Sequence, residues 1–160
     1  MKKAIDILQK TQTIVGSIFL TIFLLTVVVQ MLTRYIGVSA IWTEDVSMYS
    51  FIWSIFMGAS VMVRDNKHFA FTAFADKIKS EKAKKIIAIV IHILMLVFNV
   101  LIAYYGYTLM MKFWNYKWVS IPSFKRGPTW LCLPVAGVTS VIYLIELLVN
   151  DVKGLKGGAN

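Results

Sequence analysis

The chain has 160 residues, of which 58% are hydrophobic and 16% are charged, and its formal net charge at pH 7 is +9. This composition excludes an ordinary soluble domain of the same length and indicates an integral membrane protein. The excess of positive charge does not indicate a nucleic-acid partner, because such binding needs a basic face that lies in water.

Four stretches are long and apolar enough to cross a bilayer, which takes about 20 residues of helix. In chain order, the sequence predicts spans over about 11–35, 44–63, 84–111 and 128–149. Because few residues remain outside them, residues 1–160 are expected to form one all-α membrane domain. The first stretch is about twice as long as the apolar core of a signal peptide, so it is expected to remain as a transmembrane helix.

The basic residues are distributed unevenly between the two sides that these spans define. Twelve Lys and Arg residues fall in the N-terminal segment, the connection between the second and third spans, and the C-terminal tail, whereas five fall on the other side. Positive charge accumulates on the cytoplasmic side of membrane proteins. Both termini are therefore expected in the cytoplasm, and the basic side is expected to contact anionic phospholipids.

The two longer connections between spans both combine aromatic and charged residues. Over about 68–82, the alternation predicts a short amphipathic helix at the cytoplasmic interface, although a solvated loop is the alternative. The connection between the third and fourth spans has the composition of an aromatic belt, although it would also suit an acidic soluble partner. The residues expected at the lipid interface are Phe69, Phe71, Phe74, Trp114 and Trp118.

The second span has a stripe of small residues on one helical face. Ser54 and Gly58 follow two further serines at spacings of three and four, a pattern typical of helices that approach closely in membranes. Trp42 and Trp53 fall on roughly the opposite face. The stripe predicts a close helix contact, either within the chain or with a second, larger membrane protein.

Three charged residues flank the connection between the first two spans. The first span ends at Arg34, and Glu44 and Asp45 precede the apolar run of the second span. Because the connection is short, Arg34 is expected to reach one of the two carboxylates near the outer interface. Such a pair would fix geometry more than it would add stability. The alternative is three ordinary interfacial charges.

The chain lacks the residue patterns that catalysis requires. Its one cysteine, Cys132, excludes an internal disulfide, and its two histidines, His68 and His92, are poorly placed to hold a haem between helices. No cluster has metal-ligand spacing, so neither a cofactor nor an enzymatic activity is expected. No carboxylate is expected near the middle of a span, where ion and substrate paths usually have one. The chain is therefore expected to be an accessory subunit.

An ordered set of residues in the first two spans resembles a known family. The pattern consists of Arg34-Tyr35, Trp42-Thr43-Glu44-Asp45, Trp53, Gly58-Ala59, and Arg64 followed by His68. It is similar to the DctQ-type small membrane subunit of tripartite ATP-independent periplasmic (TRAP) transporters. One departure is Asp45, where a second Glu is common, and this departure keeps the acidic chemistry.

The resemblance implies a multi-pass protein of the bacterial inner membrane with two protein partners. One is a large DctM-type membrane subunit, which uses the sodium gradient and moves substrate like an elevator. The other is a periplasmic solute-binding protein that delivers an organic acid. The sialic-acid (SiaQ) branch, for N-acetylneuraminate, is the expected one, with a C4-dicarboxylate as the alternative. The small subunit would brace the scaffold of the large one.

The resemblance also implies roles for the motif residues. Five of them would hold the shape of the subunit or its contact with the large partner: Arg34, Trp42, Glu44, Asp45 and Trp53. Arg64 and His68 would lie at the cytoplasmic surface near lipid headgroups. Two other function classes remain open at this stage: a small channel or carrier formed by self-assembly, and a membrane-anchor subunit of a redox complex.

Overall fold

The computed structural model describes residues 2–65 and 81–157. These residues form α1 (Lys2–Ile36), α2 (Trp42–Arg64), α4 (Glu81–Lys112), the short 3-10 helix η1 (Gly127–Leu131) and α5 (Cys132–Gly157). Within these ranges, the regular structure is helical apart from one isolated bridge between Lys117 and Lys125. Four of the helices are long and apolar enough to span a membrane. The predicted all-α fold with four spans is confirmed.

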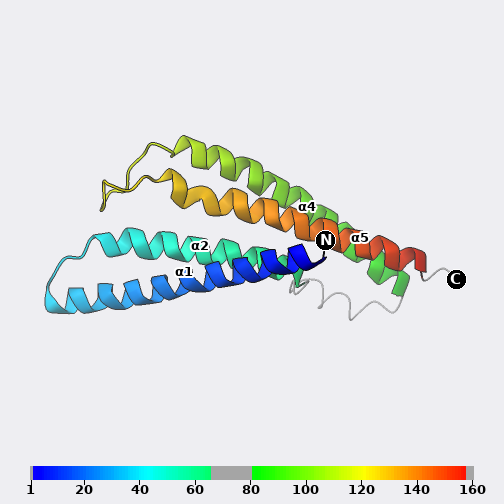
Figure 1. The fold of residues 1–160 in the computed structure, drawn as a ribbon, viewed down its shortest axis with the longest axis horizontal. Helices are drawn as coiled ribbons and strands as arrows, with labels where there is room; N and C mark the ends of the chain where they lie inside the picture. The colour runs from blue at the N-terminus through cyan, green and yellow to red at the C-terminus, as the bar shows by residue number, and fades with distance from the viewer. Residues whose placement is uncertain (1, 66–80, 158–160) are drawn as a thin grey trace.

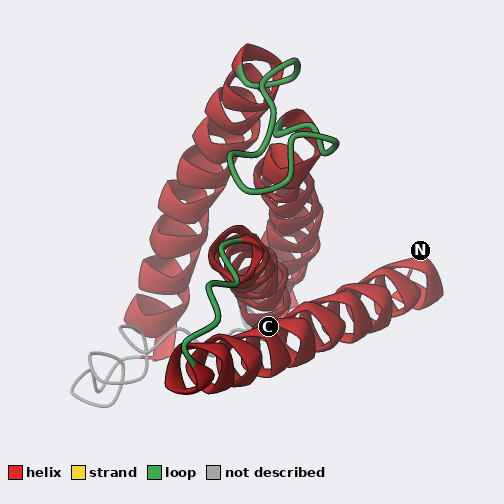
Figure 2. Ribbon diagram, turned by 90° about the vertical axis from the view of Figure 1, so that its left-hand side faces the viewer, coloured by secondary structure: helices red, strands yellow, loops and turns green. Residues whose placement is uncertain are grey.

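The helices form two antiparallel hairpins that lie alongside one another (Figure 1). One hairpin is α1 with α2, the other is α4 with α5, and the main contact between the hairpins is that of α2 with α5. Figure 2 shows α1 and α4 at opposite margins of this arrangement. The molecule therefore has a turn end, with the α1–α2 connection and residues 113–126, and a terminal end, where α1 begins and α5 ends.

The α1–α2 turn depends on one residue with left-handed backbone geometry. Gly37 has φ of +79°, which glycine adopts without the steric cost that a Cβ would impose. The Val38 amide donates to the Thr33 carbonyl and the Gly37 amide donates to the Arg34 carbonyl. This pair of hydrogen bonds is a Schellman motif. It ends α1 sharply and directs the chain back into α2.

Each hairpin is held by glycines at its helix crossing. A Cβ at Gly137 of α5 would lie 2.6 Å from the Ala103 nitrogen of α4, and one at Gly106 would lie 2.6 Å from the Leu133 Cβ. In the other hairpin, a Cβ at Gly16 of α1 would lie 3.2 Å from the Met57 Cβ of α2. Small residues let membrane helices approach until their backbones touch, so these glycines fix the spacing within each hairpin.

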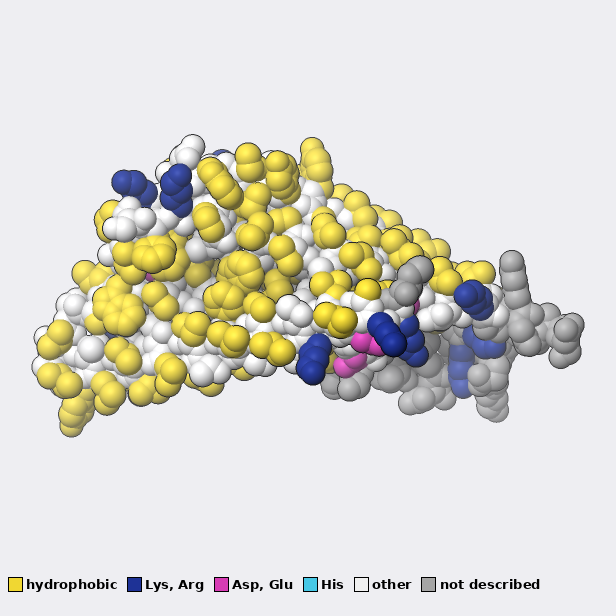
Figure 3. Space-filling view, viewed as in Figure 1, with side chains coloured by type: hydrophobic (Ala, Val, Ile, Leu, Met, Phe, Trp, Pro, Cys, Tyr) yellow, Lys and Arg dark blue, Asp and Glu magenta, His cyan; other side chains and the backbone are white. Residues whose placement is uncertain are grey.

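Little of the apolar surface is buried within the chain. Two small clusters form the interior, one around Met57, Cys132 and Ala136 and the other around Val63, Tyr143 and Leu144. Only 11% of the most apolar window of α1, and the same share of α4, is buried. On the face drawn in Figure 3, hydrophobic side chains cover the middle, and Lys and Arg side chains lie toward the ends. The exposed apolar faces are thus available to lipid or to another membrane protein.

The helices extend beyond the predicted spans at several ends. Instead of beginning at residue 11, α1 begins at Lys2, because the helix continues through a charged segment that is not itself apolar. Similarly, α5 runs to Gly157 rather than to residue 149. The predicted interfacial helix over 68–82 lies almost entirely outside the described residues. The same holds for four predicted site residues: His68, Phe69, Phe71 and Phe74.

Candidate functional site

The predicted ion pair across the α1–α2 turn is present. The Arg34 guanidinium lies 3.6 Å from the Glu44 carboxylate, and the two side chains are 73% and 65% exposed. Glu44 also lies in the first turn of α2, where a negative charge is stabilised by the helix dipole. An ion pair this exposed contributes about 1 kcal/mol or less. Its role is to align the ends of two helices.

The second carboxylate of the motif has a different partner, which sequence reasoning did not identify. Asp45 accepts hydrogen bonds from the Ser120 amide at 3.1 Å and from the Ser120 hydroxyl at 2.6 Å. Ser120 belongs to the segment between α4 and η1, which folds back on itself through the bridge between Lys117 and Lys125. Asp45 therefore joins the start of α2 to the connection of the other hairpin.

Aromatic rings support this join at the turn end. Tyr49 of α2, which is 4% exposed, lies 4.9 Å from the Trp118 ring and 6.0 Å from the Trp130 ring. Trp114 packs close to Gly127 and is 39% exposed. The Trp118 ring thus packs on α2 within the chain, a contact that the predicted lipid role did not include. Lipid contact at Trp114 stays a prediction.

The two tryptophans of α2 differ in their surroundings. The Trp53 indole donates to the Thr129 carbonyl of η1 at 2.9 Å, and its ring stacks on Phe19 of α1 at 4.9 Å. Trp53 therefore holds α1, α2 and η1 together, as expected of a residue that maintains the shape of the subunit. Trp42 begins α2 and is 44% exposed, so it is available to contact lipid or protein.

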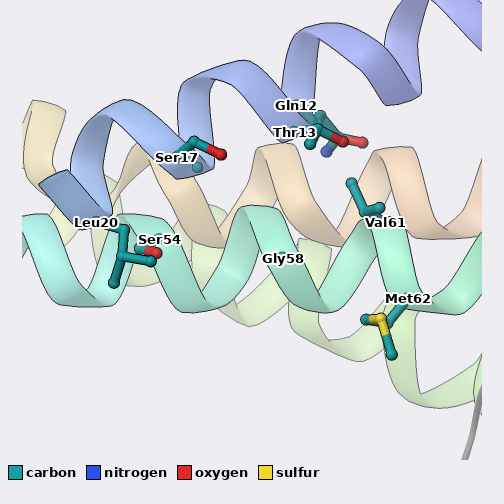
Figure 4. Close-up of a pocket in the computed structure, with 9 residues that line it drawn as sticks. Gln12, Thr13, Ser17, Leu20, Ser54, Gly58, Val61 and Met62 are labelled. Carbon is teal, nitrogen blue, oxygen red and sulfur yellow. The ribbon is translucent and has the colours of Figure 1, made fainter.

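The small-residue stripe of α2 ends in an open groove. Ser54 and Gly58 line a groove of about 280 Å³ between α1 and α2, together with Gly16. Figure 4 shows Gly58 on α2 between Ser54 and Met62, beside α1. A Cβ at Gly58 would meet nothing within 4 Å. The backbone of the stripe nevertheless lies close to α1: a Cβ at Gly16 would lie 3.7 Å from the Ser54 carbonyl oxygen and 3.8 Å from the Gly58 nitrogen. A contact with a second protein stays a prediction.

A buried polar cluster joins three helices. The Gln12 amide of α1 donates to the Thr139 hydroxyl of α5 at 2.8 Å and accepts from the Tyr143 hydroxyl at 2.5 Å. Ser60 of α2 donates to the Ala136 carbonyl at 3.0 Å, and the Ser140 hydroxyl lies 3.0 Å from the Ser60 hydroxyl. Polar groups away from water need such partners. The cluster therefore specifies how α1, α2 and α5 pack.

The terminal end contains a cluster of charges around Arg64. Its guanidinium pairs with Asp6 of α1, lies 3.3 Å from the Glu146 carboxylate of α5, and donates to Gln9. The Arg64 side chain is only 13% exposed. The prediction that Arg64 lies among lipid headgroups is wrong, because these partners draw the side chain between the helices. The cluster ties α1, α2 and α5 together at this end.

A second charged contact at the terminal end joins α4 to α5. His92 of α4 lies 2.7 Å from the Asp151 carboxylate of α5, measured at Nδ1, and its side chain is 3% exposed. The sequence raises His92 only as a candidate haem ligand and does not identify this partner. With the Arg64 cluster, this contact shows that the acidic side chains at the terminal end serve helix packing.

The polar side chains buried among the long helices are paired with one another or with the backbone. Within the described portions of α1, α2, α4 and α5, every buried side-chain nitrogen or oxygen has a hydrogen-bonding partner. The charged clusters lie toward the helix ends, and the interior holds neutral amide and hydroxyl groups. Such an interior specifies packing. Three buried nitrogens without a hydrogen-bonding partner in the described ranges lie outside these four helices, at the turn end: Trp118 Nε1, Arg126 Nε and Trp130 Nε1.

Comparisons with known proteins agree with the motif in the first two spans. A family model for the DctQ component of tripartite ATP-independent periplasmic transporters matches residues 23–154. A comparison with curated proteins found no significant match. The matched residues include the last part of α1, from residue 23, and all of α2, with the motif that begins at Arg34, and they continue through α4 into α5. The chain therefore belongs to the DctQ family of TRAP transporter components.

Proposed function

We propose that this chain is the small subunit that braces a DctM-type transport subunit in the inner membrane, with both termini in the cytoplasm. The observation that supports this role is the internal pairing of the buried polar side chains in the described parts of α1, α2, α4 and α5; the buried nitrogens of Trp118, Arg126 and Trp130, which have no partner among the described residues, lie outside these four helices. A subunit that bound the ion or the substrate by itself would need buried polar groups free to take a ligand. A rigid frame needs the opposite, since its polar groups must fix its own packing.

The exposed surfaces suit a membrane partner. The described helices leave wide apolar faces uncovered, and the groove at Ser54 and Gly58 offers a place where another helix could pack closely. In this proposal the α1–α2 hairpin contacts the large subunit. The Arg34–Glu44 pair joins the two helices of that hairpin, and the Asp45–Ser120 bonds hold the hairpin to the connection between α4 and η1.

The rest of the transport cycle is assigned to the partners. A periplasmic solute-binding protein delivers an organic acid at the turn end, and the large subunit uses the sodium gradient to import it. The proposed substrate is sialic acid, N-acetylneuraminate, with a C4-dicarboxylate as the second candidate. This chain binds no cofactor in the proposal, and its membership of a transporter family sets it apart from enzymes.

Isolation of the tagged chain from its native membrane in a mild detergent tests the proposal. We expect one much larger, many-span protein to co-purify at about one to one, identified by mass spectrometry. In proteoliposomes with an inward sodium gradient, the complex and its binding protein should take up labelled N-acetylneuraminate in preference to succinate. Recovery of the chain alone as a homo-oligomer would overturn the accessory role, whereas uptake of succinate would change only the substrate.

A pair of variants tests which face contacts the partner. Gly58→Leu fills the groove of the α1–α2 hairpin, and we expect it to release the large subunit without unfolding the chain. Thr108→Leu places the same side chain on the exposed surface of α4 and is the control. Co-purification of the partner with Gly58→Leu in normal yield would reject this hairpin as the contact.

A further inference from the structure

A second groove lies at the terminal end, away from the groove at Gly58. It has a volume of about 530 Å³ and runs between the start of α1 and the second half of α5. Four branched apolar residues form its wall: Ile5, Ile142, Ile145 and Val149. Two lysines, Lys2 and Lys153, also line it, each within a few residues of a chain terminus. The groove thus combines a hydrophobic surface with positive charge.

The charge of these lysines is not neutralised within the described part of the chain. The groove also contains Glu146, but its carboxylate pairs with Arg64 at 3.3 Å. Asp6, one turn along α1 from Lys2, pairs with the same guanidinium. Asp151, close to Lys153 on α5, pairs with His92 at 2.7 Å. The three carboxylates that could neutralise the lysines are thus bonded elsewhere, and the groove keeps a positive charge.

We infer that this groove binds one anionic phospholipid, of the phosphatidylglycerol class, from the leaflet at the terminal end. One acyl chain lies along Ile142, Ile145 and Val149, and the phosphate lies between Lys2 and Lys153. Two lysines beside an apolar wall match a phosphate joined to hydrocarbon, and basic pockets between helices recognise such headgroups. The positive-inside distribution makes this leaflet the cytoplasmic one, and the volume is within the range of about 300–1,000 Å³ typical of ligand sites.

This inference goes beyond the proposed transport role and does not depend on it, because the groove is formed by this chain alone. The full-length chain, in the complex as isolated, is transferred to mixed micelles that contain phosphatidylglycerol or phosphatidylcholine. Native mass spectrometry measures how much of each lipid stays bound. We expect one phosphatidylglycerol to be retained. Each lysine near the phosphate should favour phosphatidylglycerol over phosphatidylcholine by slightly more than about fivefold, so that the two lysines together give a preference of about thirtyfold.

The variant Lys2→Gln/Lys153→Gln should lose that preference, whereas Lys3→Gln/Lys10→Gln, with the same loss of charge on a neighbouring surface, should keep it. Ile145→Trp leaves the charges in place and fills the apolar wall, so it should reduce retention of phosphatidylglycerol even if the lysine variant fails to fold. Unchanged preference in the lysine variant, or unchanged retention of phosphatidylglycerol in Ile145→Trp, would overturn the inference. So would glycerol phosphate competing as well as the lipid.

Discussion

Replacing Arg64 by Met tests whether the charge cluster at the terminal end holds the helices together. The guanidinium pairs with Asp6 and Glu146, whose side chains are 53% and 22% exposed, while its own side chain is 13% exposed. The substitution keeps much of the apolar stem and removes the charge. It leaves the Glu146 carboxylate between helices without its cation.

Removing one partner of a fully buried ion pair costs about 3–5 kcal/mol. We expect a smaller loss here, about 2 kcal/mol, because water can reach Asp6 and part of Glu146 once the guanidinium is gone. For a chain of this size, such a loss lowers the unfolding midpoint by about 4–8 °C. The double variant Arg64→Met/Glu146→Leu should recover most of the loss, since it leaves no unpaired charge between the helices.

The assay is thermal unfolding of the purified chain in detergent, followed by the fraction that stays monodisperse after heating. Arg34→Met is the matched control, because it breaks an ion pair that is largely exposed and should cost about 1 kcal/mol or less. The reasoning would be refuted if Arg64→Met lowered the midpoint no more than Arg34→Met does. Additive losses in the double variant would equally show that Arg64 and Glu146 do not stabilise one another.

Three further substitutions have outcomes that follow from the packing. Gly137→Ala should lower the free energy of unfolding by about 1–3 kcal/mol, because its Cβ would enter the α4 backbone. Gly58→Ala should be neutral or slightly stabilising. Equal effects of the two substitutions would contradict the assigned crossing of α4 and α5. Gln12→Leu should cost about 1–2 kcal/mol, since it leaves the Tyr143 hydroxyl without its acceptor; the double variant Gln12→Leu/Tyr143→Phe, which removes that hydroxyl as well, is the control and should lose less than the sum of the two single changes. Asp45→Ala should make residues 113–126 more accessible to limited proteolysis while the helix content stays unchanged. A rate of cleavage equal to that of the native chain would show that the bonds to Ser120 do not hold this segment in place.

The positions of the spans could be predicted from the sequence because hydrophobicity along the chain identifies them directly. The four spans fall within the observed helices. Their ends could not be predicted equally well, because a helix continues into polar residues once its backbone bonds are formed. At Lys2 and at Gly157 the helix extends past the apolar run. At the turn, the short connection was sufficient to predict that Arg34 meets Glu44.

Contacts between distant segments could not be predicted in the same way. Periodicity indicates which residues share a helical face, but it does not indicate which other face meets it. Asp45 and Ser120 are 75 positions apart, and Gln12 and Tyr143 are 131 apart. Gln12 stands among polar residues at the start of the first span, next to Thr11 and Thr13, so little in the sequence indicates that it is buried. Nor does the sequence identify which helix supplies its partner.

The link between Gln12 and α5 has a consequence for biogenesis. Synthesis proceeds from the N-terminus, so the α1–α2 hairpin enters the bilayer before the residues that satisfy Gln12 have been made. During that interval the amide faces lipid or a neighbouring helix without Thr139 and Tyr143, at a free-energy cost typical of unpaired polar groups in hydrocarbon. A nascent chain that stops before α5 therefore has a Gln12 amide without its partners, and completion of the last span supplies Thr139 and Tyr143.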